Sequence, residues 1–222
     1  MRTISGQPVC ETIEELTRPQ SSALVLVDMQ NDYLGAGGVD RERGEFAEAH
    51  ARGIEPNTAR VLARARELGV SVVYLRYARQ ADHRHESPST LRWMFVKRGY
   101  DESVQSTVEG TPGWQVIDEL APRVAEIVID KRRPSGFFGT SLDTTLKARG
   151  LKTVIFAGVS THGCVEATAR DAELRDYYVV LLEDCLGAYQ DELHQAALTV
   201  MKSRYDVFDS ESLLQTWGSA AR

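Results

Sequence analysis

One cysteine stands where a reactive thiol would be expected. In "IFAGVSTHGCVEATARD", Ile155–Asp171, an apolar run typical of a buried strand ends at Gly158, and Cys164 follows six residues later, where a helix begins. Backbone N–H groups at a helix N-terminus favour an anion, and a free thiol needs such help to act as a nucleophile at neutral pH. The spacing predicts a nucleophile, although a lone cysteine is also a common core residue.

Two charged residues end other predicted strands. "SALVLVD", Ser22–Asp28, ends in a carboxylate, and "EIVIDK", Glu126–Lys131, ends in an ammonium group. Taken singly, Asp28 could cap the following turn and Lys131 could be a surface residue. In parallel sheets, however, reactive groups gather at the carboxyl ends of the strands. We therefore expect the acid, the ammonium group and the thiol to meet at one sheet edge.

Alternating strands and helices define the fold class. We expect strands at 22–28, 70–76, 126–131, 152–159 and 177–184, and helices at 56–69, 113–122, 140–150, 164–176 and 191–205, with a short tail at 206–214. Such alternation implies crossover connections and a three-layer α-β-α fold with a mostly parallel, Rossmann-like sheet. We expect a single α/β domain over residues 1–222, with its core at about 20–210 and an N-terminal extension at 1–19. The irregular segment 77–111 is long enough to be functional.

Composition narrows the partners and the compartment. The chain has 222 residues, 42% of them hydrophobic, and a net charge of -6 without a basic block, which disfavours a nucleic-acid partner. No apolar run is long enough for a membrane span, and the N-terminus lacks a signal-peptide pattern. The three cysteines are far apart, so we expect free thiols in the cytoplasm, with Cys10 and Cys185 as structural residues.

Other motifs give weaker evidence of function. The glycines at 35–38 match neither a dinucleotide-binding nor a phosphate-binding loop, so no cofactor is predicted. His83 and His85 lie in a charged segment, where solvated histidines are more common than metal ligands. His162 precedes the thiol by two residues, a spacing at which side chains around a turn usually diverge, and we do not expect a catalytic role for it.

At this point the sequence resembles a known family. "LVLVDMQNDYL" and "IDKRRPSGFFGTSLDTTLKARGLKTVIFAGVSTHGCVEATARDAELRDYYVVLLEDC" are similar to the isochorismatase-like cysteine hydrolases, especially the N-carbamoylsarcosine, biuret and ureidoacrylate amidohydrolase branch. The similarity runs from about residue 20 to about residue 210. It combines a D-x-x-N strand end, a K-x-x-x-S-x-F segment and a G-V-x-T-x-x-C-V turn, which together are far more specific than any one of them.

The resemblance implies a catalytic triad and a reaction. Asp28, Lys131 and Cys164 match the family's Asp-Lys-Cys triad, and the family's cis peptide would join Val159 to Ser160. The backbone amides of Ser160 and Cys164 would then form an oxyanion hole. The implied activity is hydrolysis of a linear C–N bond in a small amide, ureido or carbamoyl compound, through a thioester or thiocarbamate on Cys164, with release of ammonia.

Substrate contacts are predicted less directly. The D-x-x-N match makes Asn31 a candidate, and Phe137 and Phe138 could form the wall of a small pocket or pack beneath the loop. A substrate carboxylate would need a cation, and the candidates near strand ends are Arg76, Arg79 and Arg133. A neutral substrate such as biuret would need none of these. Relatives usually form homodimers or homotetramers, and we expect the same here.

Three alternatives remain open at this level. Isochorismatases share the fold but have no nucleophilic cysteine at this turn, so Cys164 argues against that activity. Nicotinamidases add a metal site with a D-x-H-x-x-x-H pattern, which Asp82, His83 and His85 do not match, so we expect no catalytic metal, although a nicotinamidase-like or aliphatic amidase activity remains possible. A non-catalytic binding or assembly module would not require the charged pair to accompany the thiol.

Overall fold

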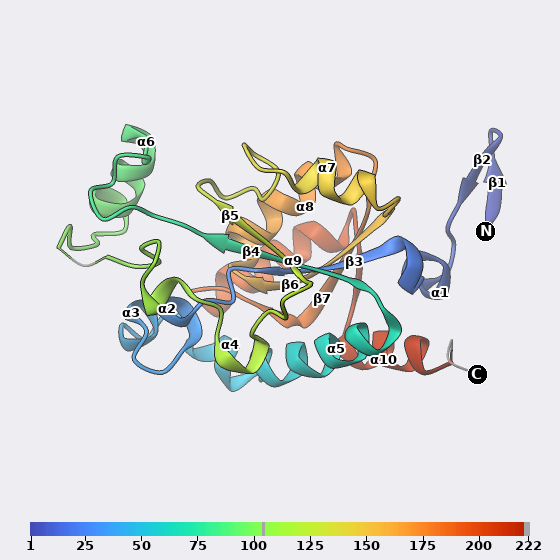
Figure 1. The fold of residues 1–222 in the computed structure, drawn as a ribbon, viewed down its shortest axis with the longest axis horizontal. Coiled ribbons are helices and arrows are strands. Elements are labelled where there is room, and N and C mark those ends of the chain that lie inside the picture. Colours follow the sequence, from blue (N-terminus) through green and yellow to red (C-terminus); the bar gives the residue numbers. More distant parts are fainter. Residues whose placement is uncertain (104, 220–222) are drawn as a thin grey trace.

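A parallel sheet forms the centre of the molecule (Figure 1). The computed structural model describes residues 1–103 and 105–219, and within them six strands run parallel to their neighbours. Their spatial order is β5 (Ile127–Lys131), β4 (Ser71–Tyr77), β3 (Ser22–Val27), β6 (Thr153–Val159), β7 (Tyr178–Gly187) and β8 (Asp206–Phe208). The chain builds outward from β3 on one side and from β6 on the other, so the topological switch point lies between these two strands.

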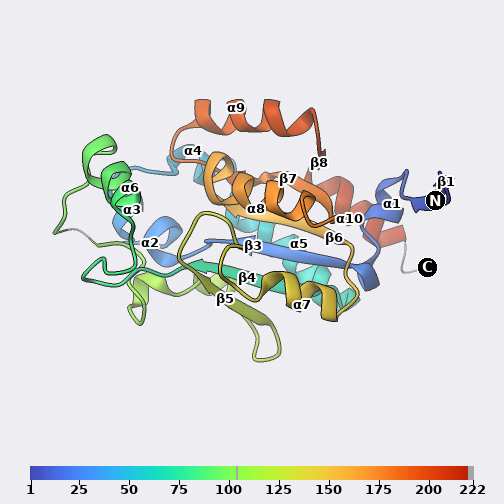
Figure 2. The same ribbon diagram turned by 90° about the horizontal axis from the view of Figure 1, so that it is seen from above.

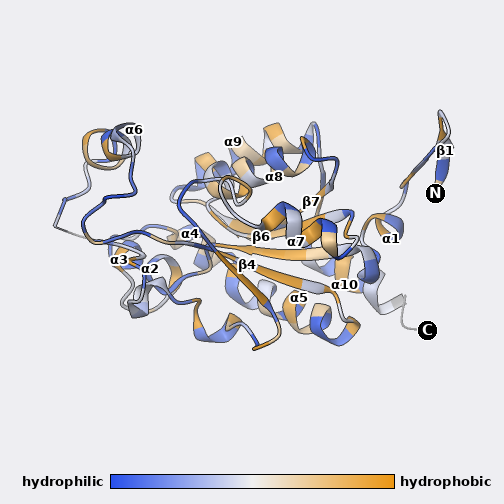
Figure 3. Ribbon diagram, turned by 45° about the horizontal axis from the view of Figure 1, so that its top comes forward, coloured by the Kyte–Doolittle hydropathy of each residue, from blue (hydrophilic) through white to orange (hydrophobic). Residues whose placement is uncertain are grey.

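Helices cover both faces of the sheet (Figure 2). Side chains of β3 alternate between two cores, with Leu24 and Leu26 in one and Val25 and Val27 in the other. The first core also contains side chains of α5 (Ile54–Leu68) and α10 (Ser210–Ser219), and the second contains those of α7 (Leu142–Ala148), α8 (Glu166–Glu173) and α9 (Asp191–Lys202). The hydrophobic colour of the strands in Figure 3 reflects this burial on both sides. The predicted three-layer α/β class is confirmed.

Shorter elements lie around this frame. An antiparallel hairpin of β1 (Arg2–Ile4) and β2 (Gln7–Val9) precedes α1 (Ile13–Leu16). Four single-turn helices follow β3 or β4, at α2 (Asn31–Leu34), α3 (Val39–Glu42), α4 (Ala47–Ala51) and α6 (Pro88–Leu91). Figure 1 shows α6 beyond the carboxyl end of β4, at the opposite end of the molecule from the hairpin. Among the described residues, no helix is both long and apolar enough to cross a membrane.

The predicted helix at 113–122 is wrong. That stretch contains two separate 3-10 turns, Pro112–Trp114 and Asp118–Leu120, with an extended residue between them. Val116 forms a bridge with Gln30, and the N–H of Ile117 donates to the carbonyl of Met29 at 3.0 Å. The backbone therefore pairs with the chain after β3 instead of with itself. Periodicity alone could not predict this long-range pairing.

The predicted tail at 206–214 is also wrong. This segment contributes β8 to the sheet and then begins α10. Asp184 holds the helix start, because its carboxylate accepts bonds from both the backbone N–H (2.7 Å) and the hydroxyl (2.5 Å) of Ser210. Leu213 and Trp217 are buried under α5, and the Trp217 indole donates to the carbonyl of Thr17 at 2.9 Å. The C-terminal helix is thus part of the core.

The two central strands approach each other too closely for a side chain at Gly158. Its φ is +123°, and an added Cβ would stand 2.1 Å from the carbonyl oxygen of Val27. Val27 and Gly158 are register partners in β3 and β6, immediately before the residues that carry the predicted acid and the turn with the predicted thiol. Glycine therefore sets the spacing between these two chain segments.

Replacing Gly158 by alanine should destabilise the protein by at least about 3 kcal/mol, because two buried backbone segments would have to separate. The matched control is Gly150→Ala, where φ is +68° and an added Cβ meets nothing within 4 Å. We expect the control to cost only about 1 kcal/mol. Urea denaturation of both variants measures the difference, and equal losses would contradict the close-approach argument.

Candidate active site

Asp28 and Lys131 form a buried ion pair at the carboxyl edge of the sheet. Asp28 directly follows β3, and Lys131 ends β5, two strands away. The lysine side chain spans the intervening β4, passes 4.4 Å from the ring centroid of Tyr77, and places its Nζ 2.8 Å from Asp28 Oδ2. The two side chains are 0% and 2% exposed. Since an isolated buried charge is costly, each of these groups depends on the other.

The backbone at Asp28 is held in an uncommon conformation. Its φ is +53°, in the left-handed region that residues other than glycine seldom adopt. Its N–H donates to the carbonyl of Leu75 and its own carbonyl accepts from Gln30, both at 2.8 Å. The other carboxylate oxygen of Asp28, Oδ1, is buried and has no hydrogen-bond partner among the described residues. This oxygen is therefore available to accept a proton.

Cys164 lies in the turn that follows β6. The peptide bond between Val159 and Ser160 is cis, as the resemblance implies. A π-helical turn, Thr161–Val165, leads directly into α8, and the hydroxyl of Thr168 donates to the Cys164 carbonyl at 2.6 Å. At Gly163 an added Cβ would stand 2.5 Å from Ser160 Oγ, so any other residue there would displace the Ser160 hydroxyl. The helix predicted from Cys164 thus begins as an α-helix at Glu166, and the thiol lies in the π-helical turn before it.

The electrostatics of the thiol differ from the sequence-based expectation. Burial raises the pKa of the Cys164 thiol to about 12, with Lys131 acting to lower it and Asp28 acting to raise it. For Lys131, burial acts to lower the pKa, but the nearby Asp28 and Cys164 outweigh it and the net shift is upward. We expected the helix N-terminus and an ammonium group to lower the thiol pKa. That expectation is wrong because desolvation and the carboxylate together exceed the effect of the lysine.

A cavity of about 360 Å³ opens beside the thiol. Its floor is the turn itself, through Ser160, His162, Gly163 and Cys164. The remaining walls come from the other strand ends, from α2 and from the segment around α6, namely Tyr33, Tyr77, Arg79, Ser89, Thr90, Trp93, Pro134 and Tyr189. The structure thus brings the three predicted triad residues together at one end of a pocket whose wall includes three tyrosines and a tryptophan.

Several predicted substrate contacts do not line this cavity. Phe137 is buried in the core, where its ring stacks on Tyr177 at 6.0 Å between centroids, and Phe138 is 66% exposed on the surface. Asn31 donates to the carbonyl of Pro112 at 3.0 Å and so anchors a loop. The alternative of packing beneath the loop is therefore the better description of Phe137.

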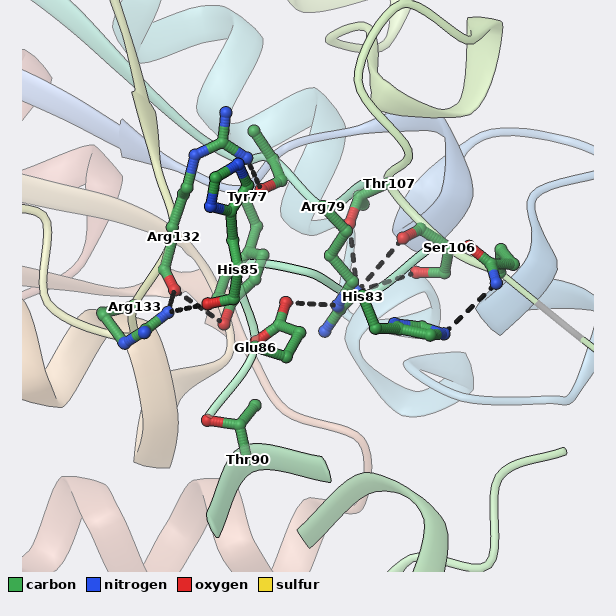
Figure 4. A network of polar contacts seen from close by, with 12 residues as sticks. Tyr77, Arg79, His83, His85, Glu86, Thr90, Ser106, Thr107, Arg132 and Arg133 are labelled. Carbon is green, nitrogen blue, oxygen red and sulfur yellow. Dashed lines mark hydrogen bonds and ion pairs between the residues drawn. The ribbon is translucent and has the colours of Figure 1, made fainter. Parts of the chain in front are cut away.

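Two of the three candidate arginines are engaged elsewhere. Arg76 pairs with Asp130, Nε to Oδ1 at 2.9 Å, and its guanidinium carbon lies 3.6 Å from the ring centroid of Trp114. Arg133 donates to the backbone carbonyl of His85 at 3.0 Å (Figure 4). Neither lines the cavity, whereas Arg79 does.

Sequence reasoning missed most of the cavity wall. Tyr77 ends β4 and Tyr189 follows β7, so the strand-end rule that identified Asp28 and Lys131 could have identified them too. Tyr33 belongs to the single-turn helix α2, and Trp93 to a π-helical turn, Arg92–Lys97, that continues α6; the sequence had no comparable signal for either.

His162 also lines the cavity, a position that the sequence did not predict. Its ring makes an edge contact with Tyr189 at 5.4 Å between centroids, and its Nδ1 is buried without a hydrogen-bond partner among the described residues. Burial, followed by the charge of Arg98, lowers its pKa, so the ring is neutral at pH 7. His162 is thus a neutral polar group on the cavity floor.

The comparisons with known proteins agree with this architecture. The Isochorismatase domain family matches residues 22–212. The chain belongs to this family. It is 37% identical over 199 residues to the ureidoacrylate amidohydrolase RutB of Variovorax paradoxus, covering 82% of this chain and 76% of that protein. The enzyme class predicted from the sequence agrees with the name of this relative.

Solved structures of the family superpose on most of this chain. An isochorismatase family protein from Desulfovibrio vulgaris superposes with a TM-score of 0.75 at 30% identity, covering 91% of this chain and 99% of the other. The N-carbamoylsarcosine amidase from Thermoplasma acidophilum gives a TM-score of 0.68 at 29% identity, covering 86% and 96%. The family predicted from the sequence is confirmed.

Within residues 1–103 and 105–219, no three side chains of the types His, Cys, Asp and Glu converge on a possible metal position. His83 instead contacts Gln105, Nε2 to Nε2 at 3.2 Å, and packs on Phe95. The expected independence from metal stays a prediction.

Burial should make the Lys131–Asp28 pair far more costly to break than an exposed pair of equal length. Lys131→Met leaves a buried carboxylate without its partner, and we expect a loss of about 3 to 5 kcal/mol in unfolding free energy. Lys147→Met is the control, since Lys147 also lies 2.8 Å from an aspartate but is 58% exposed. That variant should lose less than about 1 kcal/mol, as measured by urea denaturation. Similar losses in both variants would contradict the assigned burial.

The raised thiol pKa gives a second test. Alkylation of Cys164 by iodoacetamide should be slow at pH 7 and should accelerate up to pH 10 without a plateau, since the thiolate is the reacting form. Peptide mass spectrometry separates Cys164 from Cys10 and Cys185. A rate that levels off below pH 8 would show a lowered pKa and contradict the assigned direction.

Proposed function

We propose that this protein is a cysteine amidohydrolase that cleaves a linear C–N bond of a small ureido, carbamoyl or amide compound. The observation that supports this most is the buried Lys131–Asp28 pair acting on a thiol that lines a cavity. Membership in the isochorismatase family and the ureidoacrylate amidohydrolase relatives support the same reaction class. A binding module would have no need for an ion pair that is costly to bury at this position.

In the first half-reaction, the sulfur of Cys164 attacks the carbonyl carbon while the thiol proton passes to Oδ1 of Asp28, the oxygen without another partner. The carbonyl electron pair moves onto oxygen, where the backbone amides of Ser160 and Cys164 would stabilise it. When the C–N bond breaks, Asp28 returns the proton to the departing nitrogen. Ammonia or an amine leaves, and a thioester or thiocarbamate remains on the sulfur.

In the second half-reaction, Asp28 takes a proton from a water molecule whose oxygen attacks the acyl carbon. The C–S bond breaks and the proton returns to the sulfur, so the net change is addition of one water across the C–N bond. Lys131 keeps its charge throughout and stabilises whichever of its two neighbours is anionic. A thiol that is neutral at rest fits this scheme, because the thiolate then forms only during attack.

The cavity restricts the substrate to a small molecule. At about 360 Å³ it lies near the lower end of ligand pockets, and aromatic rings form much of its wall. A ureido acid such as ureidoacrylate fits the reaction class of the relatives. The flat aromatic walls also suit a heteroaromatic amide, which keeps a nicotinamidase-like activity as the second candidate. We further propose a single domain, a homodimer or homotetramer, a cytoplasmic location, and turnover without a cofactor or metal.

Cys164→Ser should lower turnover at least about 10³-fold, because a serine hydroxyl is a far weaker nucleophile here, and Asp28→Asn should lower it by a similar factor, because the amide cannot accept the proton. Ammonia release from ureidoacrylate, N-carbamoyl amino acids, biuret, nicotinamide and simple amides provides the assay. Cys10→Ser, far from the cavity, is the control and should change turnover less than about twofold. Turnover by Cys164→Ser within tenfold of the parent chain would refute the nucleophile assignment.

A further inference from the structure

Arg79 is a buried cation in the wall of the cavity that contains Cys164. It lies two residues beyond β4, and its side chain is 9% exposed. Its backbone is fixed on both sides, because its N–H donates to the carbonyl of Thr107 at 3.0 Å and its carbonyl accepts from Glu109 at 2.9 Å. The guanidinium group is therefore held at a defined place in the cavity.

The partners of this guanidinium group leave one of its hydrogen-bond donors unused. Nη1 donates to the carbonyl of Ser106 at 3.2 Å and to the hydroxyl of Thr107 at 3.0 Å, and the guanidinium carbon lies 4.6 Å from the ring centroid of Tyr77 (Figure 4). These hydrogen-bond partners are neutral, and the Ser106 hydroxyl donates in turn to Oδ2 of the buried Asp40 at 2.8 Å, so a second carboxylate acts on the guanidinium group from behind Ser106. Nε is buried and has no hydrogen-bond partner among the described residues. A buried arginine with an unused donor is a binding group for a planar anion.

The carboxylate of Glu86 forms a long ion pair with Arg79, without a hydrogen bond. Oε1 of Glu86 is 3.8 Å from Arg79 Nε, which is too long for a hydrogen bond, and Oε2 of Glu86 is buried without a partner in the described part of the chain. Figure 4 shows this carboxylate turned toward Arg79. Glu86 precedes α6, whose Ser89 and Thr90 also line the cavity. The two charges thus face each other, while Nε of Arg79 and Oε2 of Glu86 each lack a hydrogen-bond partner among the described residues.

Elsewhere this chain makes a close arginine–glutamate pair. Arg66 contacts both carboxylate oxygens of Glu126, at 2.7 Å and 2.8 Å. The Arg79–Glu86 contact, at 3.8 Å, is looser than this pair, which joins α5 to the start of β5. It leaves the guanidinium group able to exchange one carboxylate for another.

We propose that Arg79 binds a carboxylate group of the substrate, and that Glu86 is its counterion while the cavity is empty. This deepens the proposed function and rests on it, by assigning the substrate to the N-carbamoyl and ureido acids over neutral ureas and amides. The substrate lies with its carboxylate at Arg79 and its ureido carbon at Cys164. Arg79 is a specificity-determining residue, and Glu86 competes with the substrate for it.

A matched pair of substrates tests this assignment. N-carbamoylglycine carries a carboxylate, and N-carbamoylglycinamide replaces that group by a neutral amide of nearly the same size. In Arg79→Gln the ratio of kcat/KM for the acid to that for the amide should fall about 100-fold, chiefly through a higher KM for the acid. Arg79→Lys should lose about tenfold, since an ammonium group lacks the planar fork. An unchanged ratio in Arg79→Gln would overturn the proposal.

Glu86→Gln tests the competing role in a chain that keeps Arg79. Removal of the rival carboxylate should lower the KM for N-carbamoylglycine about fivefold, in line with the loss of one weak charge–charge contact. Arg84→Gln is the control, because Arg84 is 66% exposed on the same segment and pairs with Asp82. The control should leave the ratio of the two substrates unchanged. An unchanged or higher KM in Glu86→Gln would refute the role of Glu86.

Binding without turnover separates this proposal from the proposed chemistry. Calorimetry with succinate and N-carbamoylglycine on Cys164→Ser should give a dissociation constant that Arg79→Gln weakens about 100-fold and Glu86→Gln improves. If hydrolysis fails in every assay but this pattern holds, the carboxylate site stands and the reaction is wrong. If hydrolysis occurs but neither carboxylate binds the chain carrying Arg79, the carboxylate site is wrong.

Discussion

The pairing of Lys131 with Asp28 in the buried interior is the constraint on which the site depends. Each charge would be several kcal/mol too costly to bury alone, so the sheet edge exists in this form only while both are present and correctly spaced. The spacing comes from backbone registers, in which Tyr77 stands opposite Lys131 and Val27 opposite Leu75. Cys164, in the turn after β6, then lies next to an ion pair whose position the sheet fixes.

Much of this arrangement follows from the sequence. A buried parallel strand requires an unbroken apolar run, and β3 and β6 contain such runs, so a polar residue just beyond the run must lie at the carboxyl edge. The same reasoning located Asp28, Lys131 and Cys164. Sequence reasoning failed at 113–122 and 206–214. There, hydrogen bonds to distant acceptors, the carbonyl of Met29 and the carboxylate of Asp184, decide the local structure.

The substrate side of the site was far less predictable, and the reason is physical. Phe137 and Tyr33 are both aromatic residues close to a predicted strand end, yet one enters the core and the other the cavity, and only the packing of the elements around them decides which. The thiol pKa depends similarly on the balance between desolvation and two opposed charges, which requires positions as well as residue types. Three candidate arginines could be named, but only the structure showed which one lines the cavity and keeps an unused hydrogen-bond donor.

The contact between Gly158 and Val27 has an evolutionary consequence. Because the backbones of the two central strands already touch there, the base and the nucleophile cannot drift apart as the sequence diverges without loss of the fold. The segment around α6, which carries Glu86 and Trp93, has no such restriction, since it lies outside the sheet. Substitutions in this segment can therefore change substrate specificity while the positions of the base and the nucleophile stay the same.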